Sequence, residues 1–261
     1  MKALSIAATG MLSQQLNVEV ISNNIANLNT TAFKRQRAEF QDLLYQNVER
    51  MGSNSSDAGT IVPTGIQVGV GVKTGSVYRI TEQGNLVPTG NQLDMAVNGR
   101  GMFRVQMPSG EDAYTRAGAF QLSPQGQIVT AEGFVVQPGI TVPPEATDIS
   151  INAQGEVSVK IDGQNVPQVV GQLELSLFPN ESGLDGKGDN LYMETPASGP
   201  ANVGVPFTPG FGSIVQSFLE TSNVNAVGEI TNLITAQRAY EMNSRVIATA
   251  DEMMSAATGL K

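Results

Sequence analysis

Apolar residues near the N-terminus recur every seven residues, with a second series three positions later. The repeat covers residues 2 to about 28, and Gln14 interrupts it with a polar side chain. Such a narrow stripe predicts a long helix that requires a partner, because an isolated helix with a thin apolar face is marginal in water. The positions expected to form this seam are Leu4, Met11, Val18, Ile21, Ile25 and Leu28.

The C-terminal end carries a matching seven-residue series from about residue 215 onward, with Asn243 as a polar interruption. Good N-cap residues lie in 221–225, and Gly259 is suited to end the helix. The pattern predicts a second long helix that pairs with the first as a coiled coil. The alternative is two amphipathic helices packed on one globular core. The seam positions are Leu219, Ala226, Leu233, Tyr240, Ile247 and Met254.

Between these ends the apolar period changes from seven to two. Residues 156–161 and 171–178 alternate, and shorter apolar runs occupy 95–97, 102–105, 127–130 and 134–136. Turn sequences such as Asn98-Gly99 and 124–126 separate them. The chain is therefore expected to be α+β, with terminal helices and a central, mostly antiparallel β domain.

Two segments have the composition of linkers. Residues 46–65 are rich in Gly and Ser, and residues 195–213 are rich in Pro and Gly. We expect a terminal helical domain of residues 1–45 plus 214–261, an extended insert at 46–69 and a β domain at 70–213. The insert is expected to reach onto neighbouring subunits and stiffen their assembly.

Composition excludes several chemistries. The 261 residues contain no Cys and no His, so thiol nucleophiles, Ser-His relays and ordinary zinc sites are not expected. No paired carboxylates stand out, and neither a cofactor nor a small-molecule substrate is expected. The net charge of −9 argues against binding to nucleic acid or to an anionic membrane. The first residues resemble neither a secretory signal nor a membrane span, since Thr9 and Gly10 interrupt a short apolar run.

Three motifs have weak chemical meaning. Residues 69–75 resemble a phosphate loop, but their Lys is displaced and a glycine-containing strand is the better interpretation. Residues 185–190 lack the ligands of a calcium loop and predict a polar turn. The basic cluster at 34–37 predicts a solvated or ion-paired face, or alternatively a contact with acidic surfaces of neighbouring copies.

Three sequence segments resemble the bacterial flagellar rod and hook family. They are SNNIANLNTTAFK at 22–34, DMAVNGRGMF with YTRAGAF at 94–103 and 114–120, and ETSNVN with AQRAYE at 220–225 and 236–241. Met102 departs from this pattern, where Phe is more usual. The matching motif positions are Asn23, Asn24, Asn27, Asn223, Asn225 and Arg238.

The resemblance implies a structural subunit and not an enzyme. Residues 64–72 and the C-terminal motif favour the distal rod over the proximal rod of the basal body. Family members form a hollow helical shaft that transmits torque from motor to hook and surrounds the export channel. The implied partners are further copies of the chain, proximal rod and hook proteins, the surrounding ring (bushing) proteins and the type III export apparatus.

The implied location is the rod between the periplasm and the outer membrane, reached without a cleaved signal peptide. Terminal helices that order on incorporation would suit export of an unfolded chain. Two other classes stay open at this stage. One is a β-domain binding module with stably folded helical tails, and the other is an enzyme that uses paired carboxylates.

Overall fold

The protein, described by a computed structural model over residues 2–49, 65–162 and 166–259, is divided into two compact units. The helical unit contains residues 2–26 and 225–259 and the described part of 36–78. The β unit contains residues 27–35 and 79–224. The chain therefore passes between the units after residues 26, 35, 78 and 224.

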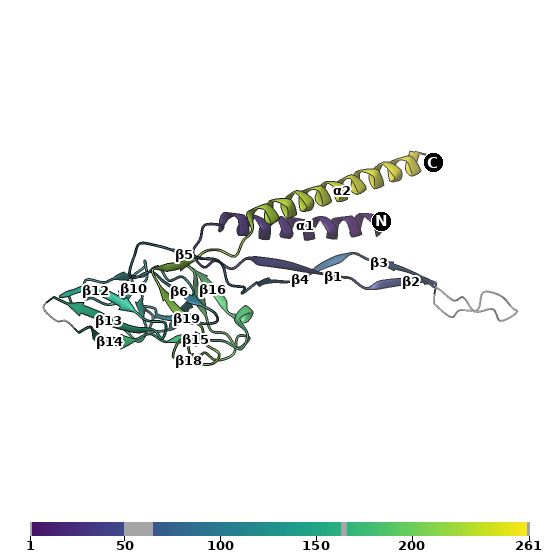
Figure 1. Cartoon of the computed structure of the whole chain (residues 1–261). Coiled ribbons are helices and arrows are strands. Elements are labelled where there is room, and N and C mark those ends of the chain that lie inside the picture. Colours follow the sequence, from purple (N-terminus) through teal and green to yellow (C-terminus); the bar gives the residue numbers. More distant parts are fainter. Residues whose placement is uncertain (1, 50–64, 163–165, 260–261) are drawn as a thin grey trace. The chain divides into compact units, whose positions relative to one another are not determined.

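Two helices lie side by side in the helical unit, α1 (Lys2–Ala26) and α2 (Ala226–Gly259) (Figure 1). They run antiparallel. A Cβ added to Gly10 would lie 2.8 Å from Nδ2 of Asn243, while Asn24 Nδ2 donates a hydrogen bond to Glu229 at 3.3 Å. Residue numbers thus increase along one helix in the direction in which they decrease along the other. The two predicted terminal helices are confirmed.

A strand ribbon completes the helical unit. β1 (Gln36–Asp42) pairs with β4 (Val72–Arg79), and β2 (Tyr45–Glu49) pairs antiparallel with β3 (Ile66–Gly69). β1 also contacts α1. The glycine-containing strand expected at 69–75 is confirmed only from Val72 onward, since β3 ends at Gly69 and β4 begins at Val72. Most of the expected insert, residues 50–64, lies outside the described residues.

The expected start of the C-terminal helix near residue 215 is wrong. Residues 213–216 form β19 and residues 218–220 form β20, which pairs with β5 (Leu86–Pro88), so Leu219 lies in a strand. Asn225 then caps α2, because its Oδ1 accepts a hydrogen bond from the Gly228 N–H at 3.1 Å. At the other end Leu28 follows the last residue of α1. Sheet pairing therefore overrides the seven-residue pattern at Leu219, whereas Leu28 lies in the turn that follows α1.

The β unit consists of short strands in antiparallel pairs. The remaining strands are β6 (Met95–Asn98), β7 (Met102–Gln106), β8 (Asp112–Thr115), β9 (Gln121–Leu122), β10 (Ile128–Val129), β11 (Val135–Val136), β12 (Ala146–Ile151), β13 (Glu156–Ile161), β14 (Gln168–Gln172), β15 (Leu175–Leu177), β16 (Asp185–Gly188), β17 (Leu191–Met193), β18 (Asn202–Gly204), β19 (Ser213–Gln216) and β20 (Phe218–Glu220), with a 3₁₀ turn at Glu181–Gly183.

The largest sheet has the order β16-β17-β8-β7-β11-β10-β9, and β15 joins it between β7 and β18. A three-stranded sheet has the order β12-β13-β14, while β19 pairs with β6 and β20 pairs with β5. The core lies among these sheets, where Phe103 packs edge-on against Phe120 at 5.1 Å between ring centroids. The predicted antiparallel β region is confirmed.

Two sequence interpretations within this unit are wrong. The alternating run at 171–178 is not one strand, since the chain turns at Leu173 and divides between β14 and β15 in different sheets. The Leu173 N–H donates to the Gly155 carbonyl at 2.7 Å, which holds the corner. Residues 195–213 do not form a plain linker, because β18 pairs with β15. Alternation of apolar and polar residues indicates which side chains are buried, but it does not show that the chain passes from one sheet to another.

Gly118 lies where a side chain would enter the main chain of β6. A Cβ added there would lie 1.5 Å from the Met95 carbonyl oxygen, whereas one added to Gly90 would meet nothing within 4 Å. We expect Gly118→Ala to lower the free energy of unfolding by about 3 kcal/mol, the upper end for overpacking. Gly90→Ala is the control and should be neutral. Chemical denaturation followed by circular dichroism measures both, and equal stabilities would contradict the close approach.

Candidate functional site

A buried ionic cluster joins the three sequence motifs within the β unit. The side chain of Glu220 is 0% exposed. Its carboxylate oxygen Oε1 lies 2.5 Å from Lys34 Nζ, and Oε2 lies 2.7 Å from Arg116 Nε. Lys34 closes the N-terminal motif, Arg116 belongs to the central motif, and Glu220 opens the C-terminal motif. One carboxylate therefore connects segments that are far apart in the sequence.

Main-chain groups satisfy the rest of this cluster. Glu220 Oε1 also accepts from the Gly84 N–H at 2.9 Å, and Lys34 donates to the Glu82 carbonyl at 2.8 Å. Arg116 donates to the carbonyls of Val97, Gly99 and Gly101 at 3.0, 2.5 and 2.6 Å. Because the donors and acceptors are paired, the buried charges are held in one arrangement.

Electrostatics follow from this burial. Burial alone would raise the pKa of Glu220, but the charges of Arg116 and Lys34 outweigh it, so the pKa lies below its usual value. Burial lowers the pKa of Lys34, and the attraction of Glu220 offsets only part of that effect. Both pKa values are thus lowered, but for different reasons: the two cations beside Glu220 favour its charged form, whereas burial disfavours the charged form of Lys34.

Asn24 closes a comparable link in the helical unit. Its side-chain amide pairs with the main chain of Gln36 in both directions, accepting from the N–H and donating to the carbonyl at 2.8 Å each. The same Nδ2 reaches Glu229, which is buried in the first turn of α2. The end of α1, the start of β1 and the start of α2 are thus tied together by one Asn.

The other motif residues have separate places. Asn223 bonds to the main chain at Arg35, and Asn225 caps α2. Asn27 accepts a hydrogen bond from the Thr30 hydroxyl at 3.0 Å in the turn after α1. Asn23 is an exposed residue of α1, and Arg238 is an exposed residue of α2. The structure therefore brings together Asn24 with the start of α2, and Asn223 with the end of the N-terminal motif.

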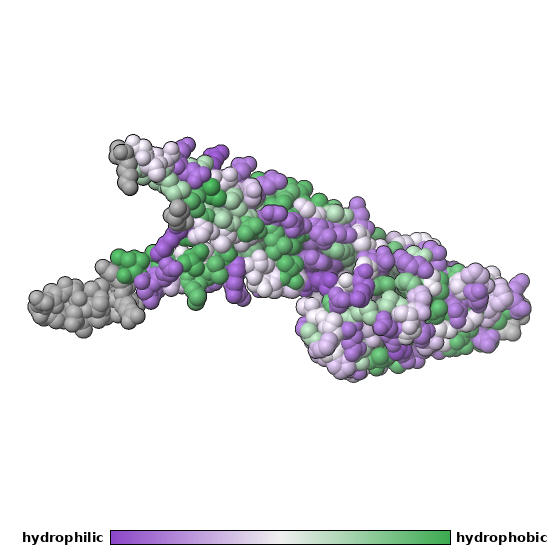
Figure 2. Space-filling view, turned by 180° about the vertical axis from the view of Figure 1, so that it is seen from behind, coloured by the Kyte–Doolittle hydropathy of each residue, from purple (hydrophilic) through white to green (hydrophobic). Residues whose placement is uncertain are grey.

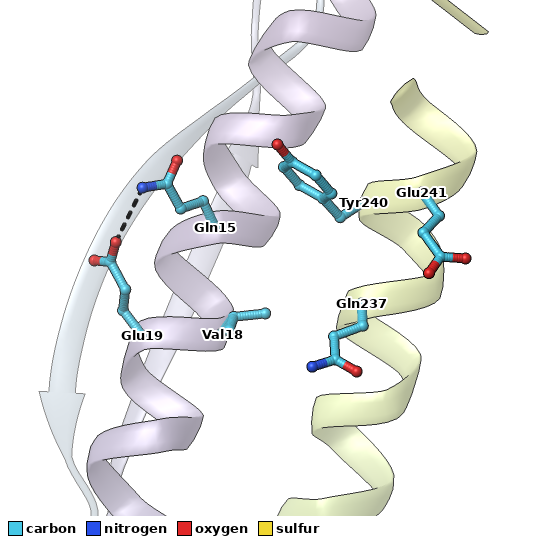
Figure 3. Close-up of a pocket in the computed structure, with 6 residues that line it drawn as sticks. All are labelled: Gln15, Val18, Glu19, Gln237, Tyr240 and Glu241. Carbon is cyan, nitrogen blue, oxygen red and sulfur yellow. Dashed lines mark hydrogen bonds between the residues drawn. The ribbon is translucent and has the colours of Figure 1, made fainter. Parts of the chain in front are cut away.

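The seam residues differ in burial. Ile21 is buried, and the half-buried seam residues on the two helices are Leu4, Met11, Val18, Ile25, Ala226, Leu233, Ile247 and Met254. Tyr240 is 44% exposed. It lines a groove between α1 and α2 together with Val18 and the polar side chains of Gln15, Glu19, Gln237 and Glu241 (Figure 3). Tyr240 and Val18 therefore border the surface of the helix pair.

Sequence analysis did not select Glu220 or Arg116, although both lie in the motifs it identified. It also assigned Lys34 to a face that could be solvated, whereas the Lys34 side chain is only 7% exposed. The ion-paired alternative is the one the structure contains. Little in the sequence indicated this burial, since Lys34 opens the basic run 34–37 and Glu220 is followed by Thr221 and Ser222. The pairing itself depends on the fold.

The described residues contain neither a membrane-spanning helix nor a cluster of metal ligands. Within residues 2–49, 65–162 and 166–259, no helix is long and apolar enough to cross a membrane. The same residues contain no group of three or more Asp or Glu side chains placed to hold a metal ion. The polar features described above are ion pairs and side-chain hydrogen bonds that join segments of the chain.

Family models match all three motif regions. A model described as flagella basal body rod protein matches residues 4–34, one for the flagellar hook protein FlgE/F/G D1 domain matches 96–159, and one for the flagellar basal body rod FlgEFG protein C-terminal region matches 215–260. The buried cluster has a member in the first and third ranges and its central member, Arg116, in the second.

Relatives match over the whole length. The flagellar basal-body rod protein FlgG of Caulobacter vibrioides is 63% identical over 100% of both chains. FlgG of Agrobacterium fabrum is 53% identical over 98% of this chain and 97% of its own. The rod protein FlgF of Caulobacter vibrioides is 32% identical over 98% of this chain and 96% of its own. Similarity to these FlgG proteins is therefore higher than to this FlgF.

These matches and the linked terminal motifs define a structural class and not an enzyme. The chain belongs to the flagellar basal-body rod protein family. Within that family it is a structural subunit of the flagellar distal rod.

Proposed function

We propose that copies of this chain assemble through their helical units into a helical hollow shaft that carries torque from motor to hook. The observation that carries the proposal is an apolar surface on α2. The helix packs against α1, yet it also exposes large apolar side chains: Val227, Ile230, Ile234, Met242, Val246 and Met253. Exposed apolar surface of this extent is typical of interaction sites.

Figure 2 shows hydrophobic (green) side chains gathered on the visible face of the helical unit. Since the chain has a net charge of −9, like charges on two copies repel each other. Apolar contacts between helices can overcome that repulsion, because burial of apolar area does not depend on charge. A contact that differs on its two sides propagates into a filament and does not close.

The arrangement proposed for the shaft has two layers. The terminal helices pair as a coiled coil through the apolar seams, with Ile21 and the buried Ala236 at the contact, and line the inner wall around the export channel. The β unit, residues 27–35 and 79–224, takes the place of the expected 70–213 as the outer layer, and the helical unit takes the place of 1–45 plus 214–261 as the inner domain.

The proposed partners follow from a shaft of this kind. They are further copies of the chain, the proximal rod and hook proteins at its two ends, the surrounding ring proteins and the type III export apparatus. The proposed location is the rod from the periplasm to the outer membrane, reached without cleavage of a signal peptide. Neither a cofactor nor a nucleic acid is required.

A complementation experiment tests this function. The chain is expressed in a flagellated bacterium that lacks its own distal rod protein, and we expect hook-bearing basal bodies and swimming to be restored. Ala236→Glu should abolish both, because Ala236 is only 2% exposed and the charge would disrupt the helix pair. Ala248→Glu places the same charge on an exposed position of α2 and is the matched control.

Two outcomes would contradict the proposal. If the unmodified chain is exported but yields no rods, it is not a distal rod subunit of that system. If Ala236→Glu assembles as well as Ala248→Glu, the paired helices are not the assembly device. Electron microscopy of isolated basal bodies gives the rod length, and swimming assays show whether the rods transmit torque.

A further inference from the structure

The side chain of Asn223 bridges two segments of the β unit that are far apart in sequence. Its Oδ1 accepts the Arg35 N–H at 2.7 Å, and its Nδ2 donates to the carbonyls of Ile80 and Glu82 at 2.9 and 3.0 Å. Its own N–H donates to the Phe33 carbonyl at 3.3 Å. The side-chain amide thus forms hydrogen bonds with the main chain of both segments and holds the two segments side by side.

These bonds require an asparagine. The site needs one acceptor for Arg35 and two donors for Ile80 and Glu82, which is the inventory of a primary amide. An aspartate of the same shape would lose both donors and place a carboxylate against two carbonyl oxygens. A glutamine would move the amide by one methylene. The side chain is therefore specified by main-chain geometry and not by burial.

The clamped residues lie next to points where the chain crosses between the two units. Arg35 is followed by β1 of the helical unit, Arg79 follows the last helical-unit residue of β4, and Asn223 lies two residues before the start of that unit at Asn225. The Ile80 N–H also donates to the Arg35 carbonyl at 2.9 Å, which closes the arrangement. Three covalent connections consequently leave the β unit from one hydrogen-bonded group.

We propose that Asn223 is a positioning residue that couples the two units mechanically, by holding these three connections at a fixed spacing. Separate linkers would each rotate about their own φ and ψ angles, whereas connections tied side by side move together. Its use in carrying torque rests on the proposed function, but the coupling is a property of the single chain.

The test uses the unassembled chain. Because the sequence has no Cys, Thr147→Cys in the β unit and Ser244→Cys in α2 give two unique sites for spin labels. Pulsed electron resonance then measures the distribution of distances between the labels. We expect Asn223→Ala and Asn223→Asp to broaden that distribution at least twofold relative to the otherwise unmodified chain.

Asn152→Ala is the matched control. Asn152 also makes three side-chain hydrogen bonds, with Gln154 and twice with Glu156, but all lie within one turn of the β unit. It should lower the melting temperature to a similar extent without changing the width. Equal widths for Asn223→Ala, Asn152→Ala and the unmodified chain would overturn the proposal. This outcome would leave the rod function untouched, since no assembly is involved.

A second measurement needs no variant and covers the case in which both Asn223 variants fail to fold. Hydrogen exchange of the Arg35 amide in the unmodified chain reports directly on its bond to Asn223. We expect its exchange to be slowed to within tenfold of the Val105 amide in the core strand β7. Exchange at the rate of an unprotected amide would overturn the clamp.

Discussion

Glu220→Gln is expected to lower the free energy of unfolding of the β unit by about 3–5 kcal/mol, the cost of leaving buried charges without their partner. Lys34 and Arg116 are 7% and 8% exposed in their side chains, so water cannot replace the lost carboxylate. Glutamine keeps the size of the side chain, which isolates the effect of charge. Guanidinium unfolding followed by circular dichroism measures the change, since the chain has no Trp.

The same substitution should change how the free energy of unfolding decreases at acid pH. The pKa of Glu220 is lowered in the folded state by Arg116 and Lys34 against the effect of burial. Its stabilising contribution is therefore fully present above the unfolded value, about pH 4.3, and is lost as the pH falls through the lower folded value. We expect the unmodified chain to lose more stability than Glu220→Gln over that acid interval.

Glu174→Gln provides the control for the measurement of unfolding. Glu174 pairs with Arg104 at 3.3 Å, but its side chain is 38% exposed and water screens the pair. The expected loss is below about 1 kcal/mol. Equal effects of the two substitutions would mean that the cluster at Glu220 behaves as a surface ion pair, contrary to its burial.

Phe103→Ala is expected to lower the free energy of unfolding by about 3–5 kcal/mol, through lost transfer energy and the cavity that remains. Phe103 is fully buried in β7, which pairs with β8, β11 and β15. Its ring meets Phe120 edge-on, so neighbouring strands cannot collapse without losing that contact. Rods built from this variant should be thermally labile even where they still assemble.

Phe207→Ala removes the same side chain from the surface. Phe207 is 66% exposed, so its loss should change the stability of the monomer by no more than about 0.5 kcal/mol. The two variants are compared by denaturation of the unassembled chain. A comparable loss for both would contradict the assignment of the core to the region around Phe103.

Much of the architecture could be predicted because it depends on local periodicity. The seven-residue series predicted both long helices, and the period of two with Gly turns predicted the antiparallel β region. The errors occur where tertiary pairing decides the outcome. Leu219 fits the helical series, but pairing of β20 with β5 makes it part of a strand. The run at 171–178 alternates throughout, yet it changes sheet at Leu173.

The candidate site was less predictable for a related reason. The Asn residues of the terminal motifs were recognisable as unusual, since several Asn in succession are poor helix formers. Their partners are main-chain groups at Gln36, Arg35 and Ile80, and main-chain groups leave no trace in the amino-acid pattern. Lys34 could be assigned to an ion pair but not to Glu220, which lies 186 residues away.

The sequence alone therefore determined that the two ends are helical, that the centre is β and that the motifs resemble those of rod and hook proteins. Each of these depends on the order of residues over short distances. Only the tertiary structure decided that Glu220 joins the three motifs, that Asn24 and Asn223 bind main chain, and that α2 begins at Ala226. These features depend on which segments meet, and they are held by ion pairs and side-chain hydrogen bonds between distant residues, whose buried polar groups require those partners.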